Sequence, residues 1–150
     1  MATIFDVANW FLSKEPMSPK KVQKLSYYFK AWGLALYGDD FIPDYQFQAW
    51  IHGPVCPELY KRYKEYGWRN IPQYTGILYD FNNDEMEVLE SVWFTYGNMT
   101  ANALEVQTHL DDPWRKTRGN LEDYQICETL IENKLMKEFY RKVYADTQSD

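Results

Sequence analysis

The feature that most constrains this fold is one long helical segment at residues 18–38, with a start signal and a stop signal. Ser18 is a favoured N-cap residue, and Pro19 stands at the first helical position, where its missing N–H is harmless. Apolar residues then recur at spacings of three and four: Val22, Leu25, Phe29, Trp32 and Leu36. Gly38 is suited to end the helix at its C-terminal side.

This helix also carries more apolar surface than one packed face requires. Tyr27, Ala31 and Leu34 lie roughly opposite its main apolar stripe on a helical wheel. Either the helix is central and covered on all sides, or its second face binds a partner. Helices that are apolar all round are usually buried, so the first interpretation is favoured. The second makes Tyr27 and Leu34 candidate partner-binding residues.

Lysines gather in the first turns of the same helix, at Lys20, Lys21 and Lys24. Positive charge at a helix N-terminus opposes the helix dipole, so these lysines require another explanation. One explanation is pairing with the acidic residues of the stretch 84–90, or simple solvation. The other is a basic spot that receives an acidic loop of a partner, which adds Lys24 to the candidates.

The rest of the chain is mainly helical in pattern. We expect helices from the cap Thr3 to residue 12, from near Pro54 to Tyr66, from Asn83 to Tyr96, from the cap Thr100 to about Leu110, and from about Ile131 to Tyr144. Alternation around Phe47, Ala49 and Ile51 indicates a short strand or hairpin, and 68–82 reads as turns with room for a second small strand pair. The fold class predicted is mainly α, a compact bundle of about five or six helices with a small β-hairpin.

Composition bounds the function. The 150 residues are 45% hydrophobic, which suits a single domain spanning 1–150, and the net charge is −6. That charge argues against phosphate-driven nucleic-acid binding, while an aromatic share of 18% suits protein interfaces. Two cysteines 71 positions apart, Cys56 and Cys127, indicate reduced thiols. No apolar run has membrane-spanning length, so a cytoplasmic protein without membrane contact is expected.

One short stretch, "AWIHGPVCPELY" at 49–60, resembles half of an active site. His52, Cys56 and Glu58 would place a thiol near a base and a helix start, as a cysteine nucleophile requires. The flanking Pro54 and Pro57 fit helix entry equally well, and a buried structural cysteine is the more ordinary reading.

Two further chemical interpretations are weak. A zinc site from His52, Cys56, His109 and Cys127 has spacings that match no finger or ribbon. The segment "THLDDPW" at 108–114 places His109 beside two aspartates, yet it more often ends a helix, with Pro113 as the stop. No nucleotide-binding or zinc-protease motif is present. We therefore expect no catalytic residues, no metal and no cofactor, and keep a small hydrolase centred on His52, Cys56 and His109 as the enzyme alternative.

Three blocks together resemble a known family. They are "KKVQKLSYYFKAWGLALYGDDF" at 20–41, "FQAWIHGPVCPELYKRY" at 47–63, and "YGNMTANALEVQTHLDDPW" at 96–114. Their order and spacing are similar to the Panacea, or SocA-like, antitoxin domain, often found beside prophage genes. The resemblance covers roughly residues 3–145, and Val22 stands where the family's helix signature usually has Leu. The segment 115–130 is less recognisable.

The resemblance implies binding and not catalysis. Members of this family are antitoxins that neutralise a cognate toxin by direct protein contact, and at least one acts as a protease adaptor. A cognate toxin is therefore the expected partner, with a prophage-encoded adaptor for a host protein or protease as the alternative. In this interpretation 49–60 is a hinge between strand and helix, with Trp50 and Leu59 in the core. Partner contacts are expected among the following residues: Lys24, Tyr27, Leu34, His52, Glu58, His109, Trp114 and Tyr140.

Overall fold

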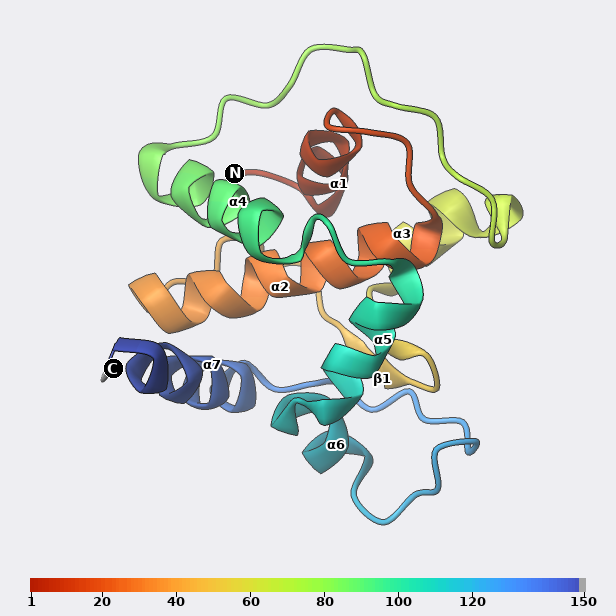
Figure 1. Ribbon diagram of the computed structural model, residues 1–150, viewed down its shortest axis with the longest axis vertical. Coiled ribbons are helices and arrows are strands. Elements are labelled where there is room, and N and C mark those ends of the chain that lie inside the picture. Colours follow the sequence, from red (N-terminus) through yellow and green to blue (C-terminus); the bar gives the residue numbers. More distant parts are fainter. Residues whose placement is uncertain (149–150) are drawn as a thin grey trace.

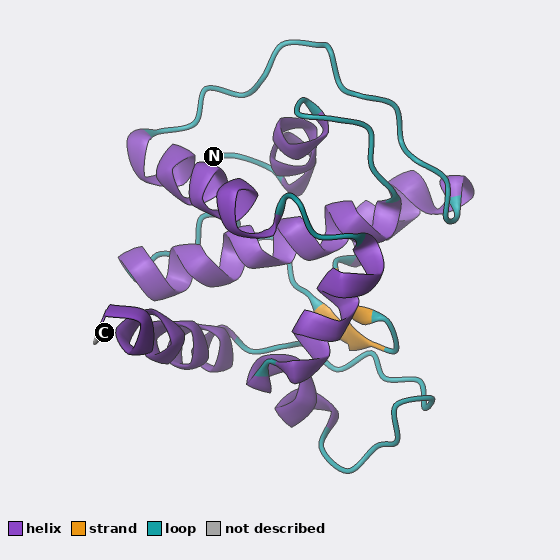
Figure 2. Cartoon of the chain, viewed as in Figure 1, coloured by secondary structure: helices purple, strands orange, loops and turns teal. Residues whose placement is uncertain are grey.

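The computed structural model describes residues 1–148 as a bundle of helices with one small hairpin (Figure 1). The helices of the described residues are α1 (Ile4–Leu12), α2 (Pro19–Tyr37), α3 (Pro57–Tyr63), α4 (Asn83–Tyr96), α5 (Ala101–Leu110), α6 (Asp112–Arg118) and α7 (Asn133–Gln148). The strands are β1 (Gln48–Trp50) and β2 (Gly53–Val55), and a 3-10 turn, η1 (Lys64–Tyr66), follows α3. The predicted mainly α fold class with a small hairpin is confirmed (Figure 2).

Helix α2 lies at the centre of this bundle. It crosses the middle of the molecule, with α1 and α4 on one side and α7 on the other (Figure 1). Thirteen of its 19 residues are buried, including Tyr27 and Leu34. The interpretation of a central helix is thus correct, and the outward-facing second surface is wrong. Its two apolar faces are both needed because neighbouring helices pack on both sides.

The capping signals correspond closely to the observed helix ends. Thr3 and Asp6 form a capping box at α1, and Asn82 and Glu85 form another at α4. The Ser18 side chain accepts a hydrogen bond from the backbone N–H of residue 21, and α2 ends at Gly38 in a left-handed conformation. Thr100 caps α5 in the same way as Ser18 caps α2. Local side-chain chemistry therefore sets where these four helices begin.

Three expectations need correction. The helix expected near Pro54 begins at Pro57, because 53–55 pair with β1 instead. The helix expected to end near Leu110 does end there, but a further helix, α6, begins at Asp112, with Pro113 in its first turn, where a proline suits a helix start. Within 68–82 there is no second strand pair; its one strand-like contact is an isolated bridge between Met17 and Ile71.

The hairpin is held on both sides of β1. Ala49 lies opposite Pro54 in the antiparallel register with β2. On the other edge, the Ala49 N–H donates to the Thr129 carbonyl at 3.0 Å, and the Ile131 N–H donates to the Phe47 carbonyl at 2.8 Å. The segment before α7 therefore covers the outer edge of β1, and the connection between the strands projects as a turn.

The start of β2 is packed too closely for any side chain. Gly53 has a φ of +106°, a conformation that L-residues rarely adopt. A Cβ at this position would lie 2.7 Å from Lys24 Cε and 2.8 Å from Thr108 Oγ1. The glycine thus lets the hairpin backbone approach α2 and α5 at once.

We predict that Gly53→Ala lowers the free energy of unfolding by about 2 to 4 kcal/mol, from backbone strain plus overpacking. Gly67→Ala is the matched control, because Gly67 also has a positive φ of 60° but no neighbour within 4 Å of its ideal Cβ. Urea unfolding of both variants measures the difference. An equal loss of unfolding free energy in both variants would show that crowding by Lys24 and Thr108 adds nothing to the cost of a side chain at position 53.

Candidate partner-binding site

Polar side chains of α2 hold the corner between the hairpin and α3. Gln23 Nε2 donates to the Cys56 carbonyl at 3.0 Å, and the Cys56 N–H donates to Gln23 Oε1 at 2.8 Å. The next residue, Lys24, donates from Nζ to the Pro54 carbonyl at 3.1 Å. Backbone groups at this corner are too deeply buried to bond water, so these side chains supply the partners they need.

Burial changes the chemistry of Lys24. Its side chain is 1% exposed, and desolvation lowers its pKa from 10.5 to about 7, although the nearby Glu105 opposes the shift. The Pro54 carbonyl is its one hydrogen-bond acceptor among the described residues. An ammonium group has three donors, so Lys24 retains unused hydrogen-bonding capacity.

A buried tyrosine network joins α2 and α7 to Asp111, the residue between α5 and α6. Tyr140 donates to Asp111 Oδ2 at 2.8 Å, Tyr28 donates to the same oxygen at 3.0 Å, and the Tyr27 and Tyr140 hydroxyls are 3.2 Å apart. Burial raises the pKa of Asp111, and the hydrogen bonds from Tyr140 and Tyr28 oppose that rise. Tyr27 and Tyr140 are therefore internal residues, which corrects their assignment to an exposed docking surface.

His109 and Trp114 support the hairpin from beneath. Their rings stack with centroids 3.8 Å apart, and Trp114 Nε1 donates to the Trp50 carbonyl at 2.7 Å. Partial burial lowers the pKa of His109. Arg118, which sequence reasoning missed, donates to the Ala49 carbonyl at 2.9 Å. No periodicity marks Arg118, because its role depends on a carbonyl 69 positions away in the chain.

The thiol at the corner is shielded. Cys56 is buried, desolvation raises its pKa to about 12, and its sulfur lies 3.5 Å from Glu58 Oε1. A thiol held in its protonated form is a poor nucleophile. His52 Nδ1 instead lies 3.1 Å from Glu105 Oε2. Across residues 1–148, no three His, Cys, Asp or Glu side chains are placed to hold a metal ion.

The surface around the hairpin is hollowed on both sides of Trp50, His52 and Val55. The first hollow, of about 290 Å³, is lined by Trp50, Ile51, His52, Val55, Ile126, Cys127 and Glu128. The second, also about 290 Å³, is lined by Pro19, Lys20, Gln23, Lys24, Trp50, His52, Val55, Tyr60, Lys64 and Gly67. A third, lined by Ser18, Lys20, Gly67, Trp68, Thr100, Ala101 and Asn102, continues from the second through Lys20 and Gly67. We call these three adjoining hollows the corner groove.

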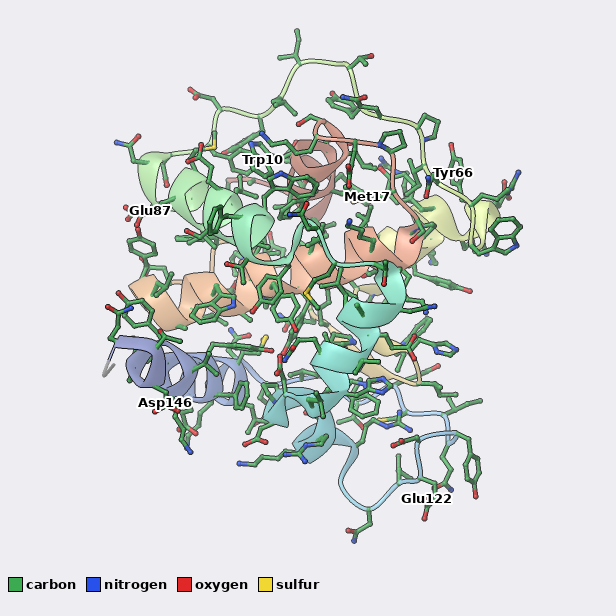
Figure 3. The ribbon with its side chains drawn as sticks, in the orientation of Figure 1. Trp10, Met17, Tyr66, Glu87, Glu122 and Asp146 are labelled. Atoms are coloured by element: carbon green, nitrogen blue, oxygen red, sulfur yellow. The ribbon has the colours of Figure 1, made fainter. Side chains whose placement is uncertain are left out.

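Exposed apolar side chains border the corner groove. Trp68 at its η1 end is 88% exposed, and Ile126 at its opposite end is 80% exposed. Figure 3 shows Tyr66 and Glu122, which mark the η1 end and the 119–130 loop end of this side of the molecule. Large exposed residues grouped around hollows are typical of a surface that another molecule covers.

Glu105 of α5 pairs with two basic side chains that line the groove. Lys20 Nζ lies 2.6 Å from Glu105 Oε1, and His52 binds the other carboxylate oxygen. Burial opposes ionisation of Glu105, but hydrogen bonds from Lys20 and His52 hold its pKa below the usual range. Lys21 pairs with Glu15 at 3.4 Å. Of the explanations offered for these lysines, pairing with residues 84–90 is therefore wrong.

The candidate residues from the sequence thus divide into groups. His52 lies exposed in the corner groove and Lys24 forms its floor, while Glu58 is exposed on α3 outside the lining. Four others are in the core: Tyr27, Leu34, Trp114 and Tyr140. His109 is half-buried beneath the hairpin. Leu59 is buried as expected, but Trp50 is only partly buried, because its ring lines the groove.

Sequence comparison identifies the family. Residues 22–115 match the antitoxin SocA-like, Panacea domain. The match covers more than half of the chain, and the chain belongs to this family. Searches of the curated proteins and of the solved structures found no match. Within the described residues, none of the helices has the length and apolar character to span a bilayer.

We predict that Lys24→Met removes a pH dependence of stability. The Lys24 pKa is lower in the folded state, so between pH 7 and 10.5 the folded protein binds fewer protons than the unfolded chain. Stability of the natural protein should therefore rise with pH in that window, by about 1 to 2 kcal/mol between about pH 7 and about pH 9 relative to the variant. Urea unfolding at both pH values measures this. Parallel pH profiles of the two proteins would show that Lys24 keeps an ordinary pKa.

Proposed function

We propose that this protein is the antitoxin of a toxin–antitoxin system and neutralises its cognate toxin by direct contact through the corner groove. The match of residues 22–115 to the antitoxin domain carries the proposal. The hairpin and α3, which form the centre of the groove, lie within the matched segment.

The composition of the groove supports a protein partner. A few tryptophan, tyrosine and arginine side chains usually carry most of the energy of a protein interface. Trp50, Tyr60 and Trp68 lie along the groove, and Ile126 adds an apolar side chain at one end. The rings of Trp50 and Tyr60 meet edge to face with centroids 4.9 Å apart, so they already form an ordered surface.

The chemistry of the same residues favours binding over catalysis. The Cys56 thiol is buried and protonated, while the exposed His52 bonds to Glu105 and not to a nucleophile. His109 is stacked on Trp114 beneath the hairpin. The three residues of the hydrolase alternative are thus engaged in separate contacts. Cys56 and Cys127 are free thiols, which suits a reducing cytoplasm, where we place the complex.

Co-expression tests this function. Expression of the chain together with the toxin encoded beside its gene should restore growth, and the two proteins should co-elute on gel filtration. Growth that returns only through repressed toxin transcription, with no complex, would contradict direct neutralisation. Growth that returns with loss of the toxin protein would indicate a protease adaptor instead.

A pair of matched variants locates the contact. Trp68 and Phe94 are both 88% exposed, but only Trp68 lines the corner groove. Trp68→Ala should weaken toxin binding about tenfold or more, as loss of an interface anchor does, and Phe94→Ala should leave it unchanged. Both variants should keep their melting temperature, because neither side chain is packed. Calorimetric titration of each variant with the toxin measures the two affinities. Weaker binding by Phe94→Ala alone would contradict the prediction and place the interface at α4.

A further inference from the structure

The second hollow of the corner groove has a charge opposite in sign to that of the whole protein. The chain has a net charge of −6, yet Lys20, Lys24 and Lys64 line this one hollow together with His52. Glu105 is the one carboxylate that pairs with this set in the described residues. Lys64 therefore brings to the hollow a positive charge that no carboxylate of the described residues neutralises.

Two of these lysines can still form ion pairs or hydrogen bonds with a ligand. Lys64 is exposed and makes no ion pair within residues 1–148, and Lys24 is bonded only to the Pro54 carbonyl. Lys24 is also almost fully buried at the floor, where the charged form of its amine would attract an anion strongly because little water intervenes. Pro19 and Lys20 place the first turn of α2 at the hollow, and the helix dipole there also favours negative charge.

The residues that line the second hollow favour an acidic side chain as its ligand over a free anion. Trp50 and Tyr60 form an aromatic side to the hollow, which suits the aliphatic part of an acidic residue. Beyond Trp50, His52 and Val55 lies the first hollow, which is mostly apolar and ends at Ile126. A bound chain with a carboxylate in the second hollow could therefore place an apolar side chain in the first.

We propose that the toxin docks an acidic segment here, with an Asp or Glu carboxylate held between Lys20, Lys24 and Lys64 and an adjacent apolar side chain in the first hollow. This inference rests on the proposed function, since it names the chemistry of the segment that the groove receives. Burial lowers the pKa of Lys24 to about 7 in the free protein, and a bound carboxylate would raise that pKa by favouring the charged amine.

A matched pair of charge reversals on α3 and η1 tests the inference on the toxin complex. Lys64→Glu should weaken toxin binding about tenfold or more, with most of the loss disappearing in high salt. Lys61→Glu makes the same change on an exposed residue of α3 that does not line the groove, and it should have little effect. Lys24→Met should also weaken binding, with circular dichroism confirming that the variant is folded. Unchanged affinity for both groove variants, with the complex still formed, would overturn the inference and leave the proposed function intact.

A second probe does not depend on the toxin. Purified protein is used to select from a random peptide library displayed on phage, with the Lys64→Glu variant as counter-selection. Enrichment of peptides with Asp or Glu next to apolar residues supports the inference, even if the neighbouring toxin does not bind and the proposed function fails. Selection of neutral or basic peptides would overturn it. So would displacement of an acidic peptide by a thymidine oligonucleotide, which would assign the hollow to phosphate.

Discussion

The structure depends on the contact between α2 and the backbone of residues 53–57. Gln23 makes two hydrogen bonds to Cys56, and Lys24 bonds to the Pro54 carbonyl. These bonds fix where β2 ends and α3 begins. They also determine the shape of the corner groove, because the same turn carries His52 outward while Gly53 is packed against α2. Removing a polar partner here would leave buried backbone groups unsatisfied, which costs more than the loss of an exposed bond.

This contact explains why polar residues occur within the "KKVQKLSYY" segment of α2. Gln23 and Lys24 bond to the hairpin corner, and Tyr28 reaches Asp111 of the "THLDDPW" segment. In the sequence these charged and aromatic residues resemble a partner-binding surface. In the structure they form hydrogen bonds between distant parts of the fold. The three blocks that identify the family meet in space around α2. The partner surface that we propose lies at the ends of this arrangement, at loops and turns.

Much of the helical framework could be predicted because its signals are local. Caps at Thr3, Ser18 and Thr100 act within one turn, so the starts of three helices follow from short stretches of sequence. Helix α6 was missed because a proline suits both a helix end and a helix start, and only the packing of Trp114 against the hairpin decides between them. Burial of Lys24 could not be predicted, since its acceptor is 30 positions away. Trp68 and Ile126 lie in turns and loops, where no periodicity marks exposed side chains.

The central claim is that α2 and its tyrosine network form a closed core, while the partner covers the corner groove. Hydrogen–deuterium exchange of the protein alone and bound to its toxin tests this claim most directly. The account predicts new protection at residues 50–53, 60–68 and 124–128, with exchange unchanged across α7 and across 25–37, the part of α2 that lies outside the groove. New protection or opening confined to 25–37 and α7, with no change at those three segments, would contradict it, because the partner would then bind the core helices themselves.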